Sequence, residues 1–152
     1  MDGTIVKKEG EPVKQFSVML QNRTGSLSSL VRLVRSANVE LLGISVQDSK
    51  DATIVRIIVT DPDTVFCLFA EKGIPHTTCE MVVVALRESG VGIGACLEAL
   101  VAAETNVEFA YSMMAHPDRH SLLALHLDDY SFGIDVLNRA GFKILYQGDL
   151  SR

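Results

Sequence analysis

One amphipathic helical pattern occurs twice in this chain of 152 residues, 66 residues apart. In each copy, apolar residues recur at the i, i+3, i+4, i+7 spacing of one helix face. The first copy comprises Leu27, Leu30, Val31 and Val34, and the second comprises Ile93, Cys96, Leu97 and Leu100. The segments around these helices repeat as well, and the offset grows from 66 to 68 between Val107 and Asp129. The chain is therefore a duplicated unit, and two copies are too few for a solenoid.

The first copy predicts the element order β-α-β-β-α-β. Polar residues Gln21–Ser26 separate a strand from a helix, and Thr24 or Ser26 could cap that helix. Asp61 and Pro62 have the cap and first-turn chemistry of a second helix. The expected strands are 13–20, 39–47, 53–60 and 76–80, and the expected helices run to about Ala37 and from Asp61 to Gly73.

The second copy predicts the same order. Its strands are expected at 81–86, 107–114, 121–127 and 142–146, and its helices end near Ala103 and at Gly141. Two such units imply an α+β fold with two ferredoxin-like halves, each an antiparallel sheet with both helices on one face. We expect a polar tail at 1–12, a first domain at 13–80 and a second at 81–152.

Composition excludes several classes of protein. The net charge of −5 and the lack of a basic stripe argue against binding to nucleic acid. No apolar run reaches the roughly 18 residues of a membrane span, and the first 12 residues lack the apolar core of a signal peptide. The three cysteines are odd in number and widely spaced. These features predict a reduced, cytoplasmic protein.

The sheet faces opposite the helices are expected to be more apolar than solvated faces should be. If Val55, Ile57 and Val59 face the helices, the alternate residues face away. These outward positions are Ile54, Ile58, Val83, Ala85, Leu122 and Ala124. We expect a second copy of the chain to cover them, which predicts a homodimer. The edge strands at 39–47 and 107–114 offer a second route to pairing.

The loop between the first strand and the first helix is the best candidate for a binding site. Its amides lie at a helix N-terminus, where unpaired N–H groups and the helix dipole favour a carboxylate or phosphate. Gly25 allows a ligand to approach the backbone closely, and Asn22 and Arg23 can add donors. The alternative is that this loop is only a capped turn.

This loop, its helix and the following Asn38-Val39-Glu40 resemble the ACT domain. The second copy, with Asn106-Val107-Glu108-Phe109 and Tyr111, resembles the second half of stand-alone tandem ACT proteins. The resemblance implies a sensor of small effectors, most often amino acids. We expect the chain to be non-enzymatic, with no cofactor and no metal. The resemblance also implies a possible amino-acid biosynthetic enzyme such as acetolactate synthase as partner. The residues that it assigns to the ligand are Asn22, Arg23, Thr24, Gly25, Ser26 and Leu27.

The corresponding loop of the second copy is a weaker candidate. It would place Ser89, Gly90, Gly92 and Ile93 at a second ligand site. Val91 stands where the first copy has Gly25, and a side chain there would crowd a ligand near the backbone. Thr24 is a milder departure, since the family often has proline at that position.

Two other classes of function stay open. His116 and His120 could form part of a metal-sensing module, but Pro117 breaks any helix that would align them. A small ferredoxin-like enzyme would need an acid, base or nucleophile in a cleft. His126 is the one candidate for that role, and the sequence shows no partner for it.

Overall fold

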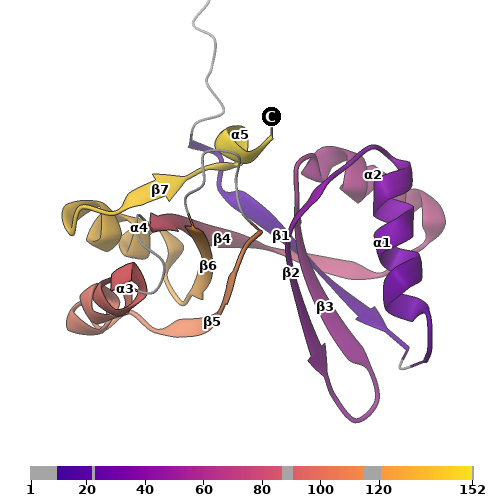
Figure 1. Ribbon diagram of the computed structural model, residues 1–152, viewed down its shortest axis with the longest axis horizontal. Coiled ribbons are helices and arrows are strands. Elements are labelled where there is room, and N and C mark those ends of the chain that lie inside the picture. Colours follow the sequence, from indigo (N-terminus) through magenta and orange to yellow (C-terminus); the bar gives the residue numbers. More distant parts are fainter. Residues whose placement is uncertain (1–9, 22, 87–90, 115–120, 152) are drawn as a thin grey trace, which may run out of the picture. The chain divides into compact units, whose positions relative to one another are not determined.

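The computed structural model describes residues 10–21, 23–86, 91–114 and 121–151 (Figure 1). The chain divides into two compact units. Residues 14–79 form the first unit, and residues from 80 onward form the second together with the segment that ends at Val13.

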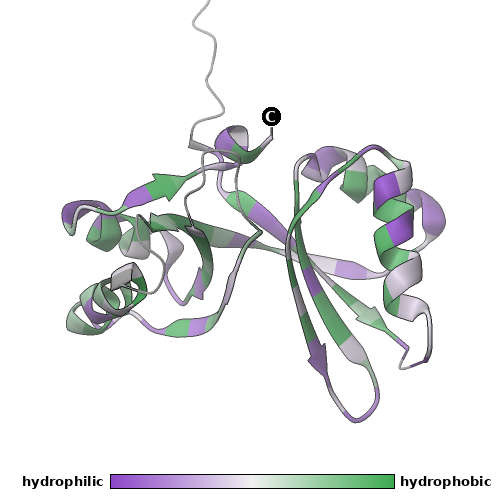
Figure 2. Cartoon of the chain, in the orientation of Figure 1, coloured by the Kyte–Doolittle hydropathy of each residue, from purple (hydrophilic) through white to green (hydrophobic). Residues whose placement is uncertain are grey.

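The first unit contains the predicted elements. They are β1 (Val13–Leu20), α1 (Ser26–Ser36), β2 (Leu41–Asp48), β3 (Thr53–Val59), α2 (Pro62–Lys72) and the start of β4 (His76–Leu86). The strand order is β2-β3-β1-β4, and β3 is antiparallel to both β1 and β2. In Figure 2, α1 alternates hydrophobic and hydrophilic residues along its length, as an amphipathic helix does.

The second unit repeats the arrangement. After β4 come α3 (Val91–Ala102), β5 (Val107–Ser112), β6 (Ser121–Leu127), α4 (Tyr130–Arg139) and β7 (Lys143–Leu145). The order is β5-β6-β4-β7, with every pair antiparallel. This is the strand order of the first unit, so the predicted pair of ferredoxin-like βαββαβ units is confirmed.

Two details differ from the predicted elements. The strands expected at 76–80 and 81–86 are one continuous strand, β4. A short helix, α5 (Gln147–Leu150), follows β7, and the spacing of apolar residues in the sequence did not predict it. The N–H of Gln147 donates to the carbonyl of Glu11 at 3.0 Å, which ties α5 to the chain before β1.

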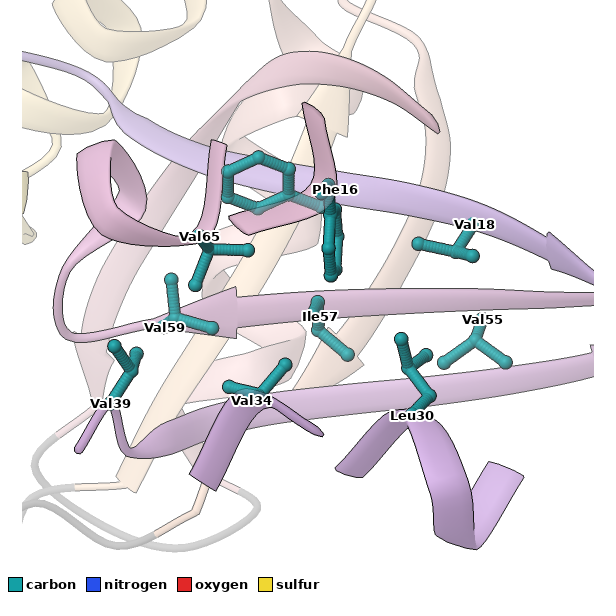
Figure 3. Close-up of a cluster of buried hydrophobic side chains, with 10 residues drawn as sticks. Phe16, Val18, Leu30, Val34, Val39, Val55, Ile57, Val59 and Val65 are labelled. Carbon is teal, nitrogen blue, oxygen red and sulfur yellow. The ribbon is translucent and has the colours of Figure 1, made fainter. Parts of the chain in front are cut away.

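Each unit has its own hydrophobic core between sheet and helices. As predicted, Val55, Ile57 and Val59 face the helices, where they pack with Leu30 and Val34 of α1 (Figure 3). The rest of the first cluster comprises Phe16, Val18, Val39, Val65 and Phe69. The second cluster comprises Val82, Val84, Leu86, Cys96, Leu100, Leu123, Leu125, Leu127, Leu137 and Ile144.

The backbone preserves the duplication in places where the side chains differ. Asn38 and Glu104, which are 66 residues apart, both have positive φ angles, of 60° and 55°. The ladder shifts register between Leu41 and Gly43 of β2, and again between Val107 and Phe109 of β5 at the same offset. The two copies therefore share helix ends and strand bulges as well as an apolar pattern.

Most of the apolar residues predicted to lie on the outward sheet faces have little exposed area. Ile58, Val83 and Ala124 are 0% exposed in the single chain, and Leu122 is 3% exposed. Ile54 and Ala85 are half-buried. These exposures give no separate reason for a second copy, and the homodimer stays a prediction. The second predicted route to a dimer, pairing between edge strands, remains open, because β2 and β5 are edge strands as predicted.

Candidate functional site

A depression of about 810 Å³ lies in the first unit where β1 ends and α1 begins. Its volume is within the range of small-molecule sites, roughly 300–1,000 Å³. The lining residues come from β1 and its loop, from one side of α1 and from the turn after α2. They are Val18, Met19, Leu20, Gln21, Arg23, Thr24, Gly25, Ser26, Ser29, Leu30, Leu33, Gly73, Ile74 and Pro75.

Gly25 sets the geometry of the loop. It is the N-cap of α1 in the left-handed region, with φ 90° and ψ −9°, a conformation that L side chains adopt only under strain. Its carbonyl accepts from the N–H of Ser29 at 2.9 Å, and the N–H of Ser26 donates to the carbonyl of Arg23 at 3.2 Å. The expectation that the side chain of Thr24 or Ser26 caps α1 is wrong, because the N-cap residue is Gly25, which has no side chain.

A glycine N-cap leaves the start of α1 suited to an acceptor from outside. The first N–H groups of an α-helix have no carbonyl partner within the helix, and Gly25 accepts none of them with a side chain. The helix dipole adds partial positive charge at the same place. The N–H of Ser26 already donates to the carbonyl of Arg23, so the amides that an acceptor from outside could bind are those of Leu27 and Ser28.

The opposite wall is the turn between α2 and β4. Gly73 ends α2 with φ 67°, and the N–H of Ile74 donates to the carbonyl of Phe69 at 2.8 Å. The carbonyl of Ile74 lies 3.0 Å from Nδ1 of His76. The His76 ring packs among aromatic rings of the core, 5.2 Å from Phe69 between centroids. These contacts fix the turn that faces the loop.

The electrostatics of the depression are simple. Arg23 is the one charged side chain among the described residues that line it. Arg23 is exposed, as are Gln21, Thr24 and Ser29 along the rim. Apolar side chains from β1, α1 and the α2–β4 turn form the rest of the lining. The site therefore offers one positive charge, several neutral hydrogen-bonding groups and an apolar surface.

The structure brings together four of the residues predicted for this loop. Arg23, Thr24, Gly25 and Ser26 line the depression. Leu27 instead packs against the hydrophobic core, and it lines a separate groove on α1. Asn22 lies outside the described residues.

Sequence reasoning missed the wall formed by Gly73, Ile74 and Pro75. The position of this wall follows from which strands are neighbours in the sheet. Gln15 of β1 contacts Cys79 of β4, whereas Val18–Leu20 lie beside Gly73–Pro75 across the depression. Since β1 and β4 run in opposite directions, the turn before β4 must lie near the end of β1. The sequence predicted the element order of a ferredoxin-like unit but did not assign the order of the strands within its sheet.

The start of α3 differs from the start of α1. Helix α3 already includes Val91, so it begins one residue earlier than the repeat offset from Ser26 predicts. Gly92 and Ile93 lie in its first turn, and Ile93 packs against the second core. A Cβ added to Gly92 would lie 3.1 Å from Cδ2 of Leu86. Ser89 and Gly90 lie outside the described residues, so this loop stays a prediction.

His126 has a partner that the sequence did not reveal. Its Nδ1 lies 2.8 Å from Oε1 of Glu108, in a geometry that does not meet the angles of a hydrogen bond. Its ring stacks on Phe109 with centroids 4.8 Å apart. Among the described residues no cluster of three or more His, Cys, Asp or Glu side chains could hold a metal. His116 and His120 lie outside the part of the chain that the structure describes.

Comparison with known proteins identifies the family. The sequence profile of the ACT domain pair matches residues 12–150. The chain therefore belongs to the family of paired ACT domains, as the sequence motifs indicated. No curated protein matches its sequence. ACT domains are small-molecule-binding regulatory modules, so membership supports a regulatory role for this chain.

Solved structures share the fold at low sequence identity. Protein BT0572 from Bacteroides thetaiotaomicron has a TM-score of 0.83 and 21% identity, over 93% of this chain and 96% of that one. The regulatory subunit of aspartate kinase from Thermus thermophilus has a TM-score of 0.56 and 10% identity, over 86% and 94% of the two chains. The alpha and beta subunits of aspartokinase have a TM-score of 0.56 and 16% identity, over 84% of this chain and 91% of that one.

Among the described residues no helix is long and apolar enough to cross a membrane.

Proposed function

We propose that this chain is a non-enzymatic regulator that binds an α-amino acid in the depression at the start of α1. The observation that carries the proposal is the glycine N-cap of α1 facing a depression of about 810 Å³. The ligand's carboxylate pairs with the guanidinium of Arg23 and is favoured by the helix dipole at the start of α1. Thr24, Ser26 and Ser29 supply hydrogen-bonding groups on the rim.

Regulation then follows from linkage. A ligand in the depression contacts three separate segments, namely the end of β1, the start of α1 and the α2–β4 turn. It stabilises whichever arrangement of these segments it binds best, and it cannot act on states that it binds equally. The output reaches either a partner enzyme or the assembly of the chain itself.

The setting we propose is the cytoplasm, and the process is amino-acid metabolism. The neighbours in fold include regulatory subunits of aspartate kinase, which supports an amino-acid biosynthetic enzyme as the partner class. Acetolactate synthase is one candidate in that class. A homodimer paired through an edge strand is the proposed assembly.

Calorimetric titration of the full chain with each common amino acid tests the proposal, with ATP as the comparison ligand. We expect saturable heat from at least one amino acid and none from ATP. A single arginine among the described lining residues gives a triphosphate little charge to pair with. Tight binding of ATP with no heat from any amino acid would refute the proposal.

A further inference from the structure

A groove of about 670 Å³ lies along the flank of α1 that is turned away from the depression, and we call this flank the outer flank. Its lining residues are Leu27, Ser28, Val31, Arg32, Arg35 and Ser36. The depression uses a different set from the same helix, which is Ser26, Ser29, Leu30 and Leu33. At 3.6 residues per turn these two sets occupy opposite flanks of α1. A molecule in the groove therefore does not compete with a ligand in the depression.

We infer that the outer flank of α1 is a docking surface for an acidic amphipathic segment of a partner protein. The segment that fits it presents apolar residues together with two carboxylates about one helical turn apart. The inference deepens the proposed function, because it names the surface through which the output reaches a partner, and in that respect it rests on the proposed function.

Helix α1 carries a positive charge in an acidic chain. Its sequence SLSSLVRLVRS contains Arg32 and Arg35 and no acidic residue. Each of the other described helices has at least as many acidic as basic residues, and the whole chain has a net charge of −5. Both arginines are exposed, and among the described residues neither is paired with a carboxylate. The two guanidinium groups can therefore pair with carboxylates from another molecule.

The spacing within the groove suits a helical partner. Arg32 and Arg35 are three residues apart, which places them one turn apart on the same side of α1. Leu27 and Val31 are half-buried and form an apolar strip beside them. An amphipathic helix that packs its apolar stripe against Leu27 and Val31 can bring acidic residues at i and i+3 or i+4 next to the guanidinium groups. The apolar contact favours binding, and the charges set the orientation.

A partner that offers only negative charge fits this groove less well. A nucleic acid or an anionic membrane surface is held by many basic residues, and the outer flank has two. The net charge of −5 also opposes the approach of either polyanion. Neither would use Leu27 and Val31, whereas a protein segment contacts the apolar strip and both arginines together.

The test begins with a phage-displayed library of random peptides, each about 14 residues long, or roughly four helical turns. Selection uses the full chain. We expect the enriched peptides to carry apolar residues and two acidic residues at i, i+3 or i, i+4 spacing. Fluorescence anisotropy then measures the affinity of the most enriched peptide after synthesis with a dye. Replacing its two acidic residues with glutamine should weaken binding by about tenfold or more, and added salt should also weaken it.

A matched pair of charge-reversal variants locates the binding surface. Arg35 and Arg139 are both exposed and lie in the last turns of α1 and α4, but only Arg35 lines the groove. We expect Arg35→Glu to weaken peptide binding by about tenfold or more, because it places a carboxylate against the carboxylates of the peptide. Arg139→Glu should leave binding within about twofold. Thermal unfolding checks that both variants are folded, and equal effects on binding would overturn the assignment.

The remaining outcomes separate this inference from the proposed function. Arg35 does not line the depression, so Arg35→Glu should leave amino acid binding unchanged. If an amino acid binds and no acidic peptide is enriched, the inference is wrong and the proposed function stands. If an acidic peptide binds through Arg35 and no amino acid binds, the docking surface stands and the proposed function fails. If light scattering shows that Arg35→Glu converts a wild-type dimer into a monomer, the occupant is a second copy of the chain and the assignment to a partner protein is wrong.

Discussion

Gly25 and Gly141 have the same positive φ angle, 90°, but only Gly25 lines the depression. A Cβ at either position would meet no atom within 4 Å, so the strain of a side chain comes from the backbone alone. The pair therefore separates the cost of a left-handed residue from the cost of blocking a ligand.

We expect Gly25→Val to abolish amino acid binding and Gly141→Val to leave it unchanged. Both variants should lose a similar free energy of unfolding, on the order of 1–2 kcal/mol, because valine is strained at positive φ. Calorimetry measures the binding, and urea unfolding measures the shared loss of stability. Retained binding in Gly25→Val would show that the ligand does not approach this part of the loop.

Cys96 makes the stability of the second unit sensitive to alkaline pH. It is 0% exposed within the second core, and burial raises the pKa of its thiol to about 11. The unfolded thiol ionises near pH 8.5. Above that pH the folded state still holds a proton that the unfolded state has lost, so stability falls as the pH rises toward 11.

The expected loss is on the order of 1 kcal/mol between about pH 8 and pH 10, measured by urea unfolding. Cys67→Ala should keep this loss, because Cys67 is exposed on α2. Cys96→Ala should remove it, although the variant starts from a lower stability because it leaves a small cavity. An unchanged pH dependence in Cys96→Ala would contradict the assignment.

At the scale of elements, the caps of the two units show how far the duplication extends. Asp61 accepts from the N–H of Thr64 at 3.2 Å, and Asp129 accepts from the N–H of Phe132 at 3.0 Å. Both residues were predictable, because an aspartate before a helix is a common N-cap. The start of α1 was not, since its cap is a glycine without a side chain.

Asp61→Ala should lower the free energy of unfolding by about 1 kcal/mol, because it removes the side-chain acceptor of a helix N-terminus. Asp63→Ala is the control in the first turn of the same helix, where the aspartate is exposed and contributes through the helix dipole. We expect a smaller loss from the control in a urea titration. Equal losses would mean that charge, and not the cap hydrogen bond, stabilises α2.

The sequence predicted the elements well and the site in part, for one physical reason. Apolar periodicity and capping residues act locally, so Leu30 and Val34 of α1 and Asp61 before α2 identified their elements without any tertiary information. Ile74 faces Arg23 across the depression only because the sheet places β4 next to β1. Two further features also depend on contacts between residues that are distant in sequence. They are the continuity of β4, which was predicted as two strands, and the formation of helix α5.

At the scale of the whole molecule, burial decides which route to a homodimer is open. Ile58 is 0% exposed in the single chain, so Ile58→Asp would bury an unpaired charge and lower stability without reporting on assembly. The proposed dimer must use surface that is exposed. Strand β2 qualifies, because it lies at a sheet edge and Val46 on it is 49% exposed.

Val46→Lys should therefore convert a dimer into a monomer, because a lysine on an edge strand opposes pairing with another edge. Val101→Lys is the matched control, since Val101 is 73% exposed on α3, away from any strand edge. Light scattering at micromolar concentration measures the mass of each variant, and thermal unfolding checks that both stay folded. We expect the wild type and Val101→Lys to be dimers. A monomeric wild type would exclude the proposed assembly, and a dimeric Val46→Lys would exclude β2 as its interface, leaving β5, the other edge strand predicted from the sequence, as the next to test.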